Sequence, residues 1–141
     1  MSDEQTNDDA AFSAAVDEGL LGIELLLDRR PFRFEDAFRA VSAAVHRTAR
    51  AKGWWDGGDR NFGELVSLMH AELSEALEGM RGGNGPSEHI PAFSAVEEEF
   101  ADVVIRIMDA AVWNGWDIAG AITAKRRFNE GRPVKHGGKT F

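Results

Sequence analysis

The feature that most constrains the fold of this chain is the recurrence of apolar residues at spacings of three and four in five separate segments. Such spacing places apolar side chains on one face of an α-helix. It predicts helices over about 10–28, 35–52, 61–81, 93–114 and 118–130. Glycine-containing loops separate the last four segments, and no segment alternates apolar and polar residues as a half-buried strand does. The chain is therefore predicted to be all-α, a bundle of four or five helices.

A length of 141 residues suits one compact domain. The polar, acidic residues 1–9 are expected to be disordered, and residues 10–31 to form an additional N-terminal helix that ends at a proline. Residues 32–141 are expected to form the main helical domain with a basic C-terminal tail. The chain contains no cysteine, so disulfides and thiolate metal sites are excluded.

The charge and hydropathy of the sequence exclude several kinds of partner. A net charge of -8 does not attract a phosphate backbone, so we expect no binding to nucleic acid. No apolar run approaches the roughly 20 residues of a membrane helix, so no membrane partner is expected. The first residues lack the basic region of a secretory signal, and a cytoplasmic location is expected. A divalent cation can still bridge acidic side chains to a small phosphorylated ligand.

Two of the expected helices carry carboxylates where apolar residues belong. At about 100° per residue, Glu72 projects into the apolar face of the third helix, and Glu75 lies at the edge of that face. On the largely apolar fourth helix, Glu99 and Asp102 are three residues apart and share one flank. Burying a lone carboxylate is costly. If the two helices pack antiparallel, the four carboxylates converge on one site.

Four converging carboxylates cannot all stay ionised without a cation. Ligands that are all oxygen atoms select hard ions. Glu72, Glu75, Glu99 and Asp102 are therefore predicted to bind Mg²⁺, with Mn²⁺ as the alternative ion. A di-iron bundle needs Glu-x-x-His pairs, and none occurs in the sequence. The alternative is that these carboxylates are solvated charges on the surface of amphipathic helices.

The remaining candidates are residues that can hold a nucleotide. Lys125 and Asn129 project onto the apolar face of the fifth helix and suit phosphate oxygens; alternatively, Lys125 forms a structural ion pair with one of the carboxylates. Trp54 and Trp55 offer indole faces for stacking on a base; alternatively, one or both pack against the end of the bundle.

These residues also carry a resemblance to a known family. Glu72-Leu-Ser-Glu75, followed after a glycine-rich loop by Glu98-Glu99-Phe-Ala-Asp102, resembles the Glu-x-x-Glu … Glu-x-x-Asp signature of the MazG-like all-α nucleoside triphosphate pyrophosphohydrolases. The resemblance extends from about Glu35 to Phe141 and includes Lys125-x-x-x-Asn129-x-x-Arg132-Pro133. The segment 10–28 does not match the pattern of the family.

The resemblance implies a bundle of four or five helices that assembles as a homodimer or a larger homo-oligomer. It implies that Mg²⁺ is held by the four carboxylates and that a (d)NTP is cleaved to a (d)NMP and pyrophosphate, often to clear noncanonical or excess nucleotides. Glu72 or Glu75 would take the proton of the attacking water. Charge on the pyrophosphate would be met by cationic side chains, namely Arg106, Lys125, Arg132 and Lys139.

Two rival interpretations remain open at this point. The first is a helical oligomerisation or interaction module without catalytic activity, whose acidic clusters are solvated or bind a basic partner. The second is a different phosphohydrolase on the same bundle, acting on a modified or diphosphate nucleotide. Because the fourth helix is apolar almost all round, we expect a homodimer or homotetramer in either case.

Overall fold

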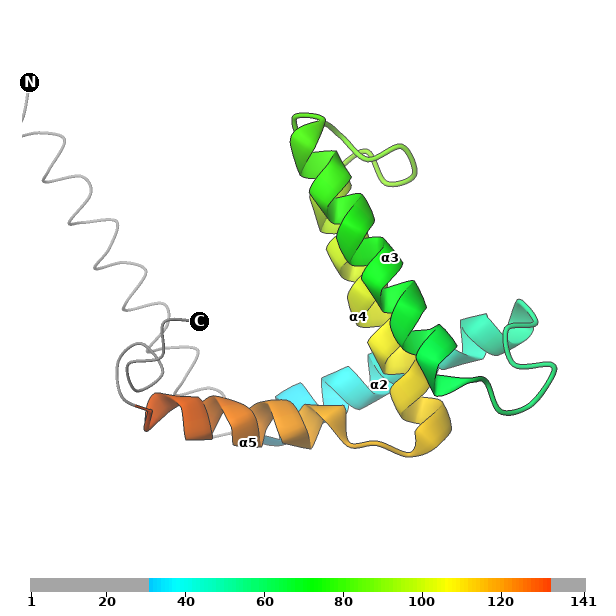
Figure 1. The fold of residues 1–141 in the computed structure, drawn as a ribbon. Coiled ribbons are helices and arrows are strands. Elements are labelled where there is room, and N and C mark those ends of the chain that lie inside the picture. Colours follow the sequence, from blue (N-terminus) through cyan, green and yellow to red (C-terminus); the bar gives the residue numbers. More distant parts are fainter. Residues whose placement is uncertain (1–30, 133–141) are drawn as a thin grey trace, which may run out of the picture. The chain divides into compact units, whose positions relative to one another are not determined.

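Residues 31–132 of the chain are described by a computed structural model. This part contains four helices, which are α2 (Pro31–Ala51), α3 (Phe62–Arg81), α4 (Ala95–Asn114) and α5 (Ile118–Glu130) (Figure 1). Within the same residues the only extended pairing is an isolated bridge between Pro86 and Ser94. The all-α prediction is confirmed, and the helices are consistent with a helical bundle.

The expectations for residues 1–30 and for the tail 133–141 lie outside the described residues. The chain divides into two compact units, 1–38 and 39–141, and the boundary falls inside α2. α2 begins at Pro31, four residues before the predicted start at Glu35. Proline suits the first helical turn, since its missing N–H would have no partner there. The candidate site lies entirely in the second unit.

The helix ends follow local signals that the sequence displays. Asn61 caps α3 by accepting a hydrogen bond from the N–H of Glu64 at 3.1 Å, and Asp117 caps α5 by accepting one from Gly120 at 3.1 Å. α4 ends at Gly115, whose φ of 70° is the left-handed conformation that favours glycine. These three boundaries agree with the prediction, because caps depend on neighbouring residues alone.

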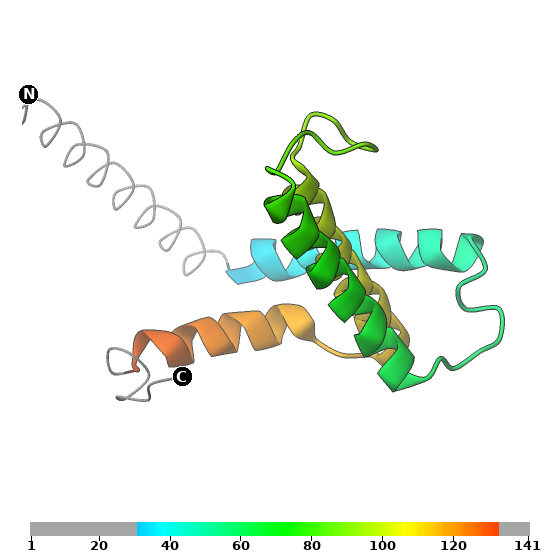
Figure 2. The same cartoon turned by 45° about the horizontal axis from the view of Figure 1, so that its top comes forward.

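α3 and α4 are joined by a loop that is fastened to the start of α4. Ser94 and Glu97 form a reciprocal capping box at the first turn of α4. The side chain of Asn84, itself in a left-handed conformation, accepts a hydrogen bond from the N–H of Val96 at 3.1 Å. The loop returns the chain beside α3, so α3 and α4 lie side by side as an antiparallel pair (Figure 2).

The buried core lies where the loop after α2 meets this helix pair. Trp55 from that loop, Leu65 from α3 and Ala110 from α4 form the buried cluster. Partly buried residues pack against it, namely Ala49, Met69 and Trp113. The core therefore links α2, α3 and α4 and fixes the positions of the acidic side chains on α3 and α4.

Candidate metal centre and adjoining pocket

Three carboxylates from the two paired helices meet at one point. One oxygen each from Glu72 and Glu75 on α3 and Glu99 on α4 lie within 4.8 Å of one another. Glu72 is buried, Glu99 is half-buried and Glu75 is exposed. The burial of Glu72 agrees with its projection into the apolar face. The antiparallel packing of α3 and α4 therefore brings together side chains that are far apart in sequence.

Asp102, the fourth carboxylate expected at this point, lies beside the group rather than within it. It is half-buried and lines an adjoining pocket. Burial raises the pKa of Asp102, and the negative charge of Glu72 adds to this effect. The structure thus joins three of the four predicted ligands closely and leaves Asp102 as a charged neighbour one helical turn along α4.

Burial and neighbouring negative charges together disfavour ionisation within this group. Burial, a hydrogen bond to Glu72 and the negative charges of Glu75, Glu72 and Asp102 raise the pKa of Glu99 to about 7. Without a cation, Glu99 therefore keeps its proton up to near neutral pH and is hydrogen-bonded to Glu72. A divalent cation would release that proton, because metal ligands bind in their deprotonated form.

Arg106 supplies the only guanidinium that pairs with these carboxylates among the described residues. Its Nε donates to Oε1 of Glu72 at 2.7 Å, and a second guanidinium nitrogen pairs with the same oxygen. The side chain of Arg106 is 30% exposed and that of Glu72 is 9% exposed. In the metal-free protein Arg106 neutralises the buried carboxylate of Glu72, and its predicted contact with phosphate stays a prediction. Lys125 was the alternative ion-pair partner for one of the carboxylates, and the structure shows Arg106 in that role at Glu72.

The donor set fits a small hard cation. All three nearby ligand atoms are carboxylate oxygens, which Mg²⁺ prefers. The three oxygens lie within 4.8 Å of one another, so one ion could contact all three after movements of the side chains. Exposure of Glu75 leaves room for the water ligands that Mg²⁺ usually retains. Glu72, Glu75 and Glu99 would hold the ion, with Asp102 adding negative charge beside it.

A pocket of about 560 Å³ adjoins the carboxylates between α2 and α4. This volume is in the range of small-molecule sites. Asp102 and Arg106 form the wall that the pocket shares with the acidic group. Two further cations, Lys52 and Arg60, and the half-exposed indole of Trp54 also line it. The guanidinium of Arg60 lies 5.2 Å from the ring centre of Trp54.

Only one of the two tryptophans expected to stack on a base is available for that role. Trp55 is buried, and its Nε1–H donates to both carboxylate oxygens of Asp109 at 3.0 and 3.1 Å. Its ring stacks on Trp113 at a centroid distance of 4.4 Å. Trp55 is therefore a core residue, as the alternative interpretation stated, and Trp54 is the one that lines the pocket.

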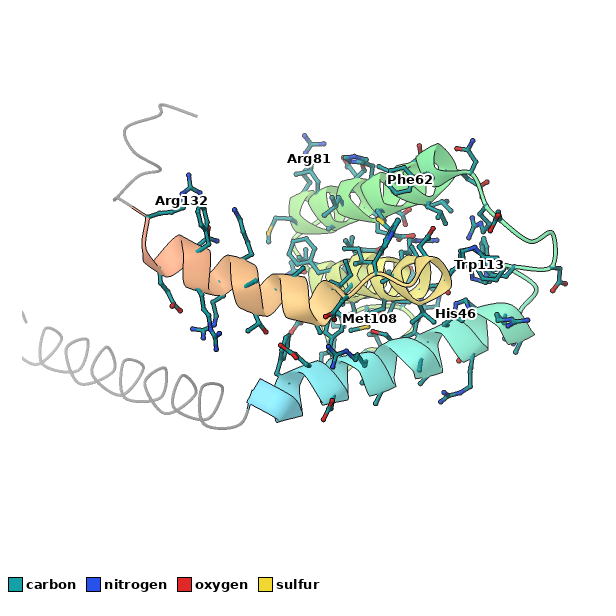
Figure 3. All side chains as sticks on the ribbon, turned by 90° about the horizontal axis from the view of Figure 1, so that it is seen from below. His46, Phe62, Arg81, Met108, Trp113 and Arg132 are labelled. Carbon is teal, nitrogen blue, oxygen red and sulfur yellow. The ribbon has the colours of Figure 1, made fainter. Side chains whose placement is uncertain are left out.

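A buried polar network behind this pocket was not predicted. Nδ1 of His46 on α2 lies 2.6 Å from Oδ1 of Asp109 on α4, and both residues are buried. Figure 3 shows His46 and Trp113 at the same end of the α2–α4 contact. The available signal was Asp109, a carboxylate on a helix that is apolar almost all round. Its partners come from α2 and the following loop, and nothing local in the sequence identifies them.

The predicted phosphate ligands on α5 are not brought to the carboxylates. Lys125 and Asn129 are exposed and line a groove formed by α5 alone. Nζ of Lys125 lies 4.4 Å from the ring centre of Phe128, and the guanidinium of Arg132 lies 5.9 Å from it. Ala119 is the only buried residue of α5, so most of this helix is uncovered by the described chain. Lys139 lies outside the described residues.

No protein-family model, curated protein or solved structure matches the chain. The interpretation of the site therefore rests on the geometry of its own residues. Among residues 31–132, no helix combines the length and hydropathy that a membrane span requires.

Proposed function

We propose that the chain is a Mg²⁺-dependent nucleoside triphosphate pyrophosphohydrolase that converts a (d)NTP and water to a (d)NMP and pyrophosphate. The observation that carries the proposal is the juxtaposition of two features. Glu72, Glu75 and Glu99 form a donor set for a hard cation, and the pocket beside them combines cationic side chains with an accessible indole. A triphosphate needs the first feature and its nucleoside suits the second.

The roles of the chain's own residues follow from their surroundings. Mg²⁺, when bound, would polarise phosphoryl oxygens and make a nearby water more acidic. Lys52 and Arg60 would attract the phosphates into the pocket, and Trp54 would stack on the base. The attacking water forms a bond to the α-phosphorus while the bond to the bridging oxygen breaks, and pyrophosphate leaves.

We propose that Glu75 accepts the proton of the attacking water. Glu72 is buried, which hinders the approach of a water molecule to its carboxylate. Glu75 lies in the same group but is exposed, so a water molecule can approach it without displacing another side chain. Positioning and charge neutralisation carry most of the catalysis in such phosphoryl chemistry.

The proposal is tested by incubating the protein with a panel of common and damaged (d)NTPs, with and without Mg²⁺, and measuring pyrophosphate separately from orthophosphate. We expect pyrophosphate and a monophosphate, and no reaction in the presence of a chelator. Glu75→Gln should lower kcat by about 10²-fold or more. Glu78→Gln is the matched control, since Glu78 lies on the same helix and pairs with Arg81 at the surface.

Each outcome of this assay separates the interpretations. Orthophosphate as the first product, or activity on diphosphates alone, would indicate a different phosphohydrolase. No turnover of any nucleotide, together with no response to Mg²⁺, would favour a non-catalytic interaction module. Equal loss in Glu75→Gln and Glu78→Gln would contradict the role of Glu75.

A further inference from the structure

The loop 52–61, which joins α2 to α3, supplies three side chains of the pocket, namely Lys52, Trp54 and Arg60. The backbone of this loop forms short turns. The N–H of Asp56 donates to the carbonyl of Gly53 at 3.2 Å, and the N–H of Gly58 donates to that of Trp55 at 3.1 Å. Such turns shape a loop locally but do not fix its place against the rest of the fold. That placement must come from side chains.

Two hydrogen bonds between an indole and a carboxylate fasten the loop to α4, and they run in opposite directions. Nε1–H of Trp55 in the loop donates to both carboxylate oxygens of Asp109 on α4 at 3.0 and 3.1 Å. Nε1–H of Trp113, one turn further along α4, donates to Oδ1 of Asp59 in the loop at 2.9 Å. The two indole rings stack with an angle of 19° between their planes. We call these two hydrogen bonds the loop clamp.

Each loop residue of the clamp is adjacent in sequence to a residue that lines the pocket. Trp55 follows Trp54, and Asp59 precedes Arg60. The guanidinium of Arg60 lies 5.2 Å from the ring centre of Trp54 and 5.7 Å from that of Trp55. Arg60 also pairs with Glu64 in the first turn of α3. Because neighbouring residues share a backbone, the clamp limits where Trp54 and Arg60 can lie.

We propose that Asp59 is a positioning residue for nucleotide binding, which acts through Trp113 by holding the loop on α4. Asp109 does the same at the other end of the clamp through Trp55. Its role toward a nucleotide rests on the proposed function, whereas the fastening of the loop does not. A loop that is ordered before its ligand arrives costs less to order on binding, so the apparent affinity is higher.

Asp59 is the member of the clamp that separates positioning from folding. Its side chain is exposed and lies outside the buried cluster of the core, so its replacement should leave the fold intact. Asp109 is buried and also contacts His46, so its replacement would disturb the core as well. The sign of the effect is informative too. Removing a negative charge beside the pocket would by itself favour a bound triphosphate, whereas loss of the clamp weakens binding.

The first test is calorimetric titration of the full chain with the α,β-methylene analogues of the common dNTPs in the presence of Mg²⁺. Asp59→Ala should weaken binding roughly fivefold, the effect of one lost hydrogen bond. Asp59→Asn should restore most of the affinity, because its amide oxygen can still accept from Trp113. Asp56→Ala is the matched control, since it removes the same charge from an exposed position of the same loop. Binding to Asp59→Ala as tight as to the wild type, or tighter, would overturn the proposal.

A double-substitution cycle tests whether Asp59 acts through the indole of Trp113. Trp113→Phe keeps an aromatic ring but removes the donor, so it should weaken binding to a similar extent. The variant that carries both Asp59→Ala and Trp113→Phe should bind no more weakly than the weaker of the single variants, because both remove the same hydrogen bond. Losses that add would overturn the proposed route.

Hydrogen exchange without nucleotide tests the clamp separately from the proposed function. Asp59→Ala should raise the exchange of the amides in residues 53–60 roughly fivefold and leave those of α3 and α4 unchanged. Exchange equal to that of the wild type would overturn the clamp. A wild type that binds none of the analogues would overturn both the proposed function and the role of Asp59 toward a nucleotide, and the exchange would still decide whether the loop is clamped. Analogue binding by the wild type with no loss in Asp59→Ala would overturn the positioning role alone.

Discussion

Replacing Arg106 by Met separates the metal site from a purely structural ion pair. In the metal-free protein, Arg106 compensates the buried carboxylate of Glu72. Breaking a buried ion pair costs about 3–5 kcal/mol. The side chain of Arg106 is 30% exposed, so solvent already screens part of the pair and we expect a smaller cost of about 2 kcal/mol. The melting temperature should then fall by about 6–8 °C.

Mg²⁺ should reverse this loss, because the cation and Arg106 compete for the same carboxylate. If Mg²⁺ replaces Arg106 at Glu72, the cost of about 2 kcal/mol disappears in the bound state. The affinity of Arg106→Met for Mg²⁺ should then exceed that of the wild type by about 30-fold. The KM for a nucleotide should rise in the same variant, since Arg106 also lines the pocket.

These effects are measured by calorimetric unfolding with and without saturating Mg²⁺, and by Mg²⁺ titration in the absence of nucleotide. Arg81→Met is the control. Arg81 pairs with Glu78 at the surface, and such a pair contributes about 0–1 kcal/mol with no link to Mg²⁺. An Arg106→Met protein that is equally destabilised with and without Mg²⁺, and whose Mg²⁺ affinity does not increase, would refute the competition.

The remaining predictions concern pH and the two tryptophans. The pKa of Glu99 is raised from 4.5 to about 7. Between these pH values the folded metal-free protein therefore keeps a proton that the unfolded chain has lost. The free energy of unfolding should fall as pH rises from about 4.5 to 7. Denaturant titrations should show this slope in the wild type and not in Glu99→Gln, and an unchanged slope would contradict the assignment. Trp55→Ala should lower the free energy of unfolding by about 3–5 kcal/mol. Trp54→Ala should change it by less than about 1 kcal/mol and raise the KM, so the opposite ranking would show that the roles are exchanged.

Local features of this fold could be predicted from the sequence because they depend on neighbouring residues. The caps at Asn61 and Asp117 and the end at Gly115 each involve side chains or dihedral angles within one turn. The inward position of Glu72 could also be predicted, since a helix of fixed pitch places every residue relative to the apolar face. The approach of Glu99 followed from the expectation that the two helices pack antiparallel.

The choice of partners across the fold could not be predicted, because it depends on the path of the chain between helices. Lys125 was the alternative ion-pair partner of the carboxylates and Arg106 a predicted phosphate ligand, and only the packing of α4 on α3 pairs Arg106 with Glu72. Trp54 and Trp55 are adjacent in one loop. Which of them enters the core is decided by Asp109, 54 residues from Trp55. The start of α5 likewise depends on a distant partner, since Arg39 on α2 donates to Asp117 at 3.1 Å.

The most direct test of the metal site is a crystal structure of the protein soaked in Mn²⁺ and measured at the manganese absorption edge. Mn²⁺ uses the same oxygen ligands as Mg²⁺ and gives an anomalous signal that water does not. The proposal predicts an anomalous peak within bonding distance of carboxylate oxygens of Glu72, Glu75 and Glu99. It also predicts that Arg106 has moved away from Glu72. Absence of a peak at this group, with Arg106 still paired to Glu72 at saturating Mn²⁺, would contradict it.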